Sequence, residues 1–271
     1  MRRITFTADD FGLSEAVNEG VERAHREGVL GAASLMVGAP AAADAVARAK
    51  RMPGLRVGLH LVAVEGPAVL PPAEIPALVG ADGWFPSGQA GLGVRFFFLP
   101  WVRRQLAAEI RAQFEAFAAT GLTLSHADAH KHMHLHPTVG RLLVETGREF
   151  GLRRVRVPAE PPGVMARLGA PGGAALYRWS ALLRRQVRRA GMVAPDAVFG
   201  LAWSGGMTAE RVRRLLAVVP QGPAFGDVEV YFHPASRRDA LLERLMPGYD
   251  HAGELAALLD PGVRAALQAM R

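Results

Sequence analysis

The sequence predicts an α/β protein with one barrel-like sheet of about seven parallel strands, and three observations lead to this prediction. Short apolar segments alternate with longer segments of helical periodicity along the 271 residues, a pattern typical of parallel sheets covered by helices. No evident linker divides the chain, so we expect a single domain over residues 1–271. Metal-binding residue types recur directly after the strand-like segments, where barrel enzymes place their catalytic groups.

The first half of the chain contains four of the predicted strands, at residues 4–8, 33–37, 55–61 and 122–127. Apolar residues at helical spacing predict helices at residues 14–27, 41–51 and 102–120. Ser14 is a typical helix N-cap, and Gly28 is a typical helix stop. The Pro- and Gly-rich stretch 62–93 is too long for an ordinary connection, so we expect a functional loop there.

The second half of the chain continues this alternation. Further strands are predicted at residues 155–158, 197–201 and 228–232. Further helices are predicted at residues 138–150, 174–190, 208–218, 239–245 and 261–270. Pro137 favours a helix N-terminus at the first of these, because the N–H that proline lacks would have no partner inside the helix.

The composition bounds the class of protein. Hydrophobic residues make up 50% of the chain and charged residues 21%, which is enough for a sizeable core and argues against global disorder. Cysteine is absent, so disulfides, thiolate nucleophiles and cysteine metal sites are excluded. The net charge of +7 comes almost entirely from arginines that are interleaved with acidic residues, so we expect no nucleic-acid partner.

The sequence shows no segment typical of export or membrane insertion. The first residues lack the apolar core of a signal peptide. The most apolar window, Gly93 to Val102, is much shorter than the roughly 20 residues of a membrane-spanning helix. We therefore expect a cytoplasmic protein.

Candidate catalytic residues follow the predicted strands. Asp9 and Asp10 follow the first strand, His60 is near the end of the third, a histidine-rich segment follows the fourth, and His233 follows the last. In a parallel barrel these positions share one face. Neighbours in an extended chain point to opposite sides, so one aspartate could bind a metal while the other transfers a proton. The alternative is a turn with a helix cap, since aspartate favours both.

The histidines allow two interpretations. His60 lies in an apolar strand and, taken alone, is typical of a hydrogen-bonded core residue. Five of the nine histidines lie within residues 126–136, and histidine is the commonest metal-binding side chain. The alternative is a histidine-rich loop without function. One carboxylate and two imidazoles suit a hydrolytic divalent cation, although they do not choose between zinc and magnesium.

Four motifs resemble one family, the YdjC/ChbG-type carbohydrate deacetylases. Thr7 to Leu13 resembles its N-A-D-D-F-G-L opening, and Val57 to Leu61 its G-x-H-x segment. His126 to His134 resembles its H-x-D-S-H-x-H-x-H stretch, and His233-Pro234 its late H-P. The motifs occur in the family's order. Three positions depart from the family's pattern without removing a proposed ligand, and these are Thr7, Ala129 and Ala235.

The resemblance implies a distorted (β/α) TIM-like barrel and a hydrolase that removes N-acetyl groups from sugars. It implies one divalent metal ion, zinc, magnesium or similar, on Asp10, His60 and His130, with Asp9 as the general base. The subgroup associated with hopanoid biosynthesis is the most similar, which implies N-acetylglucosamine on a hopanoid glycolipid as the substrate.

The remaining polar residues near these motifs receive provisional roles. A histidine must protonate the departing amine; His233 is the first candidate and His134 the second. Asp128 could orient a ligand imidazole. His126 and His132 are expected beside the ligands or against the substrate.

The window from Gly93 to Arg104 combines three consecutive phenylalanines and a tryptophan with flanking arginines. It is either buried core or a patch that contacts the inner membrane, with aromatic rings at the lipid and cations at anionic head groups. Other open alternatives are a metal-dependent phosphoesterase and a non-catalytic sugar- or glycolipid-binding module. A homodimer is a further expectation that no motif tests.

Overall fold

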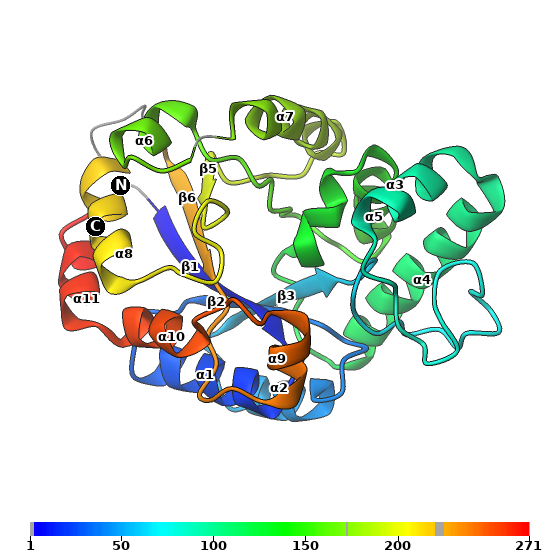
Figure 1. The fold of residues 1–271 in the computed structure, drawn as a ribbon, viewed down its shortest axis with the longest axis horizontal. Coiled ribbons are helices and arrows are strands. Elements are labelled where there is room, and N and C mark those ends of the chain that lie inside the picture. Colours follow the sequence, from blue (N-terminus) through cyan, green and yellow to red (C-terminus); the bar gives the residue numbers. More distant parts are fainter. Residues whose placement is uncertain (1–2, 172, 220–224, 271) are drawn as a thin grey trace.

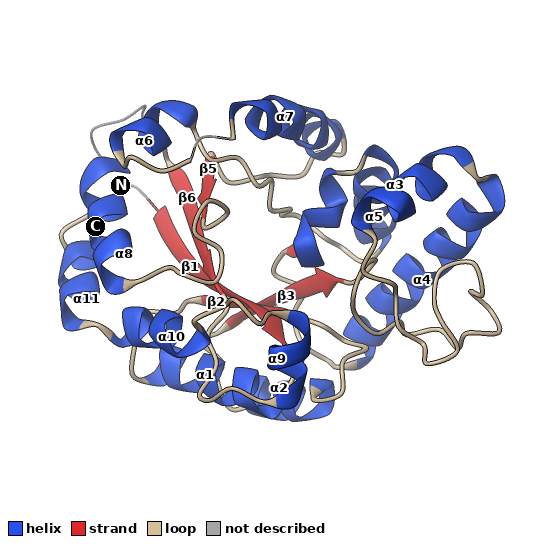
Figure 2. Cartoon of the chain, viewed as in Figure 1, coloured by secondary structure: helices blue, strands red, loops and turns tan. Residues whose placement is uncertain are grey.

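The computed structural model describes residues 3–171, 173–219 and 225–270. Six parallel strands form one curled sheet in the order β4-β3-β2-β1-β6-β5 (Figure 2). The strands are β1 (Arg3–Phe11), β2 (Ala32–Leu35), β3 (Arg56–Leu61), β4 (Ala127–Ala129), β5 (Ala197–Phe199) and β6 (Asp227–Phe232). The parallel α/β architecture is confirmed, and the number of strands is six rather than seven.

The predicted strand at 155–158 is wrong, although the segment lies where a closing strand would lie. Its backbone bonds to Ala127 of β4 on one side and to Val193, before β5, on the other; the next residue, Ala159, accepts from Val198 of β5. These are isolated bridges, not a ladder. Pro158 cannot donate a ladder hydrogen bond, which limits the pairing of this segment. The sheet is therefore closed at this seam by single contacts.

Helices surround the sheet (Figure 1). They are α1 (Glu15–Arg26), α2 (Ala42–Lys50), α3 (Gln89–Phe98), α4 (Pro100–Ala119), α5 (Pro137–Glu149), α6 (Pro162–Arg167), α7 (Ala174–Arg189), α8 (Ala209–Val218), α9 (Ala240–Leu245), α10 (His251–Leu259) and α11 (Pro261–Gln268), together with the 3-10 helix η1 (His130–Leu135). The predicted helices are present; α3, α6 and α10 were not predicted. Ser14 caps α1 as expected, accepting from the Val17 N–H. Within the described residues, no helix is long and apolar enough to cross a membrane.

The central strand β1 carries the paired aspartates into the interior. It lies between β2 and β6, and every residue from Thr5 to Phe11 is buried. The strand extends past its predicted end at Ala8, so Asp9 and Asp10 lie within it. The pairing with β2 shifts register between Ala8 and Phe11, and Asp10 has a positive φ of 61° at this irregularity. Such a bulge re-aims side chains, and here it separates the directions of the two carboxylates.

Candidate functional site

Three buried residues from different strands meet at the carboxyl end of the sheet. Asp10 comes from β1, His60 from β3 and His130 from the residue after β4. Asp10 Oδ1 lies 3.3 Å from His60 Nε2 and 3.1 Å from His130 Nδ1. One possible ligand atom from each residue lies within 4.8 Å of the others. The structure thus brings together the three residues predicted to bind a metal.

The charges of this cluster fit a divalent cation. The imidazoles of His130 and His60 hold the pKa of Asp10 well below its usual range, although burial opposes this. Burial also opposes the charged form of His60, but Asp128 and Asp10 raise the pKa of His60 to about 10. Asp10 Oδ2 is buried without a hydrogen-bond partner among the described residues. The carboxylates of Asp10 and Asp128 thus favour a positive charge beside them, and Asp10 Oδ2 is free to bind one. Both features are typical of a cation site.

A second layer of side chains fixes the orientation of His60. Asp128 Oδ1 accepts from His60 Nδ1 at 2.7 Å, and the Ser34 hydroxyl donates to Asp128 Oδ2 at 2.7 Å. His126 Nε2 lies 3.0 Å from the Ser34 hydroxyl oxygen. This chain leaves His60 Nε2 directed at Asp10, the arrangement by which neighbours commonly orient metal-binding imidazoles. Asp128 and His126 therefore support the cluster, as the sequence suggested.

The buried guanidinium of Arg156 holds the other aspartate. Its Nη1 and Nη2 atoms contact the two oxygens of Asp9 at 2.6 and 2.7 Å. The same guanidinium pairs with Asp128 at 2.9 Å and with Glu229 at 2.8 Å. Burial raises the pKa of Asp9, although Arg156 favours the carboxylate. Bidentate pairing fixes the plane of the Asp9 carboxylate, and sequence reasoning missed the arginine that does so.

Asp9, His60 and His130 line one cavity of about 190 Å³, which we call the catalytic cavity. Its other walls carry aromatic and hydroxyl groups and include His233. The lining residues are Asp9, His60, His130, Lys131, His132, Leu201, Ser204, Tyr231, His233, Met246 and Tyr249. The cavity thus combines histidines of the candidate cation site, the Asp9 carboxylate and two further histidines, His132 and His233.

His233 is held by helix α10. Its backbone N–H donates to Glu254 Oε2 at 2.5 Å, and its carbonyl accepts from His251 Nδ1 at 2.7 Å. Its ring atom Nδ1 lies 3.8 Å from the same Glu254 oxygen, a charge contact rather than a hydrogen bond. Burial disfavours the imidazolium, yet Glu254 outweighs burial and raises the pKa of His233.

The backbone turns after His130, so His132 and His134 point in different directions. Lys131 and His132 have positive φ angles of 49° and 54° inside η1. His132 Nε2 lies 2.9 Å from the Tyr231 hydroxyl at the cavity wall. His134 Nε2 donates to the Arg156 carbonyl at 2.9 Å, and burial lowers the pKa of His134 to about 4. His134 does not line the catalytic cavity, whereas His233 does.

The aromatic window divides between core and surface. Phe96 is fully buried, whereas Phe97, Phe98 and Trp101 are 49%, 68% and 54% exposed. They lie on α3 and at the start of α4. The core interpretation therefore holds for Phe96, and the other three aromatic residues are exposed.

The sequence matches the family model described as YdjC-like protein over residues 3–269. Three relatives are named carbohydrate deacetylase. The Geobacillus stearothermophilus protein is 32% identical over 94% of this chain and 88% of its own length. Those of Brevibacillus brevis and Vibrio vulnificus are 38% and 41% identical over 59% and 55% of this chain. The chain spans only 59% and 56% of the length of these two.

Two solved structures share the fold. A proposed cellobiose-phosphate cleavage protein of Enterococcus faecalis superposes with a TM-score of 0.79 at 22% identity, over 99% of this chain and 94% of that one. A lactam utilization protein of Thermus thermophilus superposes with a TM-score of 0.52 at 18% identity, over 100% and 97%. At these identities the likeness concerns the fold alone.

Proposed function

Because the chain belongs to the YdjC-like protein family, we propose that it is a metal-dependent hydrolase that removes an N-acetyl group from an amino sugar. The observation that carries the proposal is the buried Asp10–His60–His130 cluster, which opens into the same cavity as Asp9. The carbohydrate deacetylases among its relatives support this reaction class.

Asp10, His60 and His130 would hold one divalent cation. Such an ion, when bound, lowers the pKa of water and polarises a carbonyl oxygen. The three side chains supply two imidazoles and a carboxylate, and Asp128 keeps His60 in the tautomer that presents Nε2. Binding of the cation would displace the proton that the raised pKa now keeps on His60.

Asp9 is the proposed general base. It lies at the wall of the catalytic cavity, and Arg156 keeps its carboxylate in one orientation. Burial raises its pKa, which makes it a better proton acceptor than a surface aspartate. Asp9 therefore takes the proton of the attacking water, while Asp10 binds the metal.

His233 is the proposed general acid. An amide nitrogen leaves only with a proton, so a protonated group must face it. Glu254 favours the imidazolium of His233, and the ring lies in the same cavity as Asp9. His132 and the Tyr231 hydroxyl, paired at 2.9 Å, are placed to contact the sugar.

For the substrate, we propose N-acetylglucosamine on a hopanoid glycolipid, with contact between the protein and the inner membrane. The motif resemblance supports this choice. The exposed Phe97, Phe98 and Trp101 support membrane contact, because aromatic rings beside arginines favour the interface of an anionic bilayer.

The phosphoesterase alternative is disfavoured by Arg156. Hydrolases of that class commonly use paired metals, and a second group of possible ligands is formed by Asp9, His60 and Asp128. The guanidinium of Arg156 already pairs with both aspartates of that group. Its charge takes the place that a second cation would need.

The test is incubation of the metal-loaded protein with a chito-oligosaccharide and with N-acetylglucosaminyl hopanoid. We expect mass spectrometry to show loss of one acetyl group, and the preferred compound identifies the acceptor. The variant Asp10→Ala is the control for contaminating activity. If neither compound loses acetyl and a phosphate ester releases phosphate, the deacetylase proposal is wrong and the protein is a phosphoesterase.

A further inference from the structure

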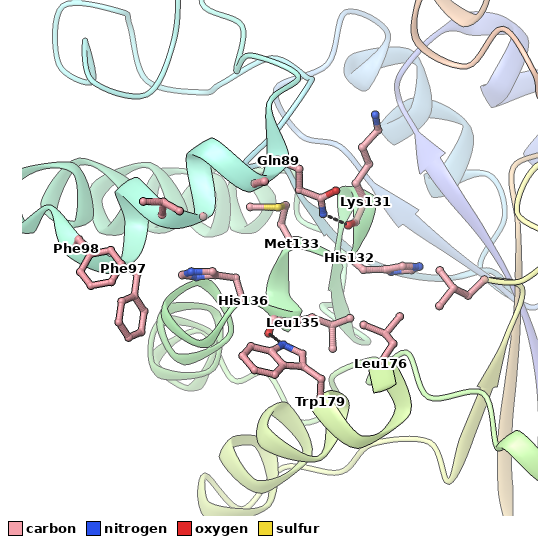
Figure 3. A pocket seen from close by; sticks show the side chains of 14 residues that line it. Gln89, Phe97, Phe98, Lys131, His132, Met133, Leu135, His136, Leu176 and Trp179 are labelled. Carbon is pink, nitrogen blue, oxygen red and sulfur yellow. Dashed lines mark hydrogen bonds between the residues drawn. The ribbon is translucent and has the colours of Figure 1, made fainter. Parts of the chain in front are cut away.

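A cavity of about 610 Å³ lies between α3, η1 and α7, beside the catalytic cavity (Figure 3). We call it the apolar cleft. Each of the three elements contributes apolar side chains to its walls, namely Val94, Phe97, Met133, Leu135, Leu176 and Trp179. Its volume and lining are those of pockets that enclose small apolar ligands.

The aromatic walls of the apolar cleft are held in position while remaining exposed. The indole N–H of Trp179 donates to the Leu135 carbonyl (Figure 3), with a distance of 2.9 Å. Trp179 is nevertheless 51% exposed. The ring of Phe97 packs edge-on against those of Phe98 and His136. An apolar ligand that covers these rings removes apolar surface from water. Because the rings are already held in place, little side-chain entropy is lost on binding.

The apolar cleft offers little to a polar ligand. Among the described residues that line it, only Lys131 carries a full charge, and Lys131 is paired with Glu65. The side-chain amide of Gln89 is engaged with the Lys131 carbonyl. Burial lowers the pKa of His136, so this ring is neutral. Most hydroxyl groups of an oligosaccharide would lose water here without gaining a partner.

The apolar cleft and the catalytic cavity adjoin each other. Lys131, His132 and Leu201 line both of them. His132 also reaches the Tyr231 hydroxyl on the catalytic side. A single ligand can therefore place a polar end among carboxylates and imidazoles and an apolar end among aromatic rings.

We propose that the apolar cleft binds the aglycone of the substrate, so that this enzyme acts on an acetylamino sugar attached to a bulky apolar group. The inference rests on the proposed deacetylase function and assigns the part of the structure that selects the acceptor. The acetylated sugar occupies the catalytic cavity, and its glycosidic substituent extends past His132 toward Phe97 and Trp179.

The test compares two soluble probes that differ only in the aglycone, methyl and dodecyl N-acetyl-β-glucosaminide, the latter below its critical micelle concentration. We expect kcat/KM to be at least about a hundredfold higher for the dodecyl compound, because each CH2 group that is buried favours binding by roughly fourfold. Phe97→Ser and Trp179→Ser should each lower the dodecyl value about tenfold and leave the methyl value unchanged.

Two further variants separate cleft binding from other causes. Ala90→Trp adds bulk at the exposed rim of the apolar cleft and should also abolish the dodecyl preference. Trp101→Ser removes an exposed aromatic residue that does not line the cleft, so it should change neither value. An equal loss in the Trp101 variant would indicate adsorption to the surface and would overturn the proposal.

The outcomes distinguish this inference from the proposed function. Equal kcat/KM values for both probes would overturn the aglycone site and leave deacetylation standing. If neither probe loses acetyl, the deacetylase function fails, and calorimetric binding of the dodecyl compound still tests the cleft. Equal dodecyl affinity in the wild type and in Phe97→Ser, Trp179→Ser and Ala90→Trp would then overturn it.

Discussion

The catalytic cavity and the apolar cleft share the wall formed by Lys131 and His132, yet they are built in opposite ways. The cavity is lined largely by polar side chains from strand ends, and its charged groups are buried with defined partners. The cleft is lined by helices and a turn, and its aromatic rings remain half exposed. In the proposed roles, the sheet determines the reaction and the helices determine what is attached to the sugar.

The sharpest way to separate the two regions is to remove the central carboxylate. Asp10→Ala should abolish metal binding, measured by elemental analysis after dialysis, and should lower deacetylation by about 10³-fold or more. Binding of dodecyl N-acetyl-β-glucosaminide to the apolar cleft should persist. Glu243→Ala, an exposed acidic residue on α9, is the matched control. Metal retained at full occupancy in Asp10→Ala would show that the site is elsewhere.

A second change divides the roles of the paired aspartates. Asp9→Asn keeps the shape of the side chain and removes its basicity, so metal content should be unchanged while kcat falls by about 10²- to 10⁴-fold. Steady-state kinetics on metal-loaded protein measures this. Activity at the wild-type level would exclude Asp9 as the base.

The stability of the catalytic side depends on Arg156. Arg156→Met leaves Asp9, Asp128 and Glu229 buried without their cation, so the free energy of unfolding in urea should fall by about 3–5 kcal/mol. Arg111→Met, on the surface, removes an exposed pair with Glu149 and should leave the unfolding midpoint nearly unchanged. Similar midpoints for the two variants would mean that the buried carboxylates do not need Arg156.

The pH dependence tests the link between α10 and the cavity. Glu254 raises the pKa of His233, so the protonated acid persists to higher pH and activity falls as pH rises through that pKa. Glu254→Gln removes the negative charge and should move the alkaline limb of kcat/KM down by roughly one pH unit. A ¹⁵N NMR titration of His233 measures the same shift without turnover. If neither the alkaline limb of kcat/KM nor the NMR titration of His233 shifts in Glu254→Gln, Glu254 does not control the pKa of His233.

The smallest expected effect concerns two exposed aromatic residues, Phe98, which lines the cleft, and Trp101, which does not. Phe98→Ser combined with Trp101→Ser should weaken binding to vesicles of anionic phospholipid by roughly tenfold, measured by sedimentation. Both residues are exposed, so the fold should be unaffected. Tyr177→Ser, at an exposed aromatic residue on α7, serves as the comparison. Unchanged vesicle binding would count against membrane contact.

The place of the candidate metal cluster was predictable because its residues follow strands of a parallel sheet, whose carboxyl ends share one face. The choice of Asp10, His60 and His130 among the aspartates and histidines came from the motif resemblance. Arg156 was not predictable in this way. An arginine in an extended segment is ordinarily exposed, and its partners come from β1, β4 and β6, far apart in the sequence.

The apolar cleft and the number of strands depended on packing that local patterns do not encode. The glycine-rich start of α3 has low helix propensity, so the sequence predicts a loop and an aromatic window over residues 89–98 instead of a helix. The cleft exists only because α3, η1 and α7 come together around α5. At 155–158 the apolar alternation predicted a strand, and Pro158 limited the ladder to isolated bridges.

The seam between β4 and β5 has a consequence for how the protein is inactivated. Few backbone hydrogen bonds close it, so we expect it to open before the rest of the sheet unfolds. Arg156 lies on the seam segment and holds Asp9 from there. If the seam opens while β1, β2 and β3 stay paired, the guanidinium of Arg156 still moves away from Asp9, the proposed base. Heating should therefore abolish the proposed deacetylase activity at temperatures where the circular dichroism spectrum is still that of the native protein.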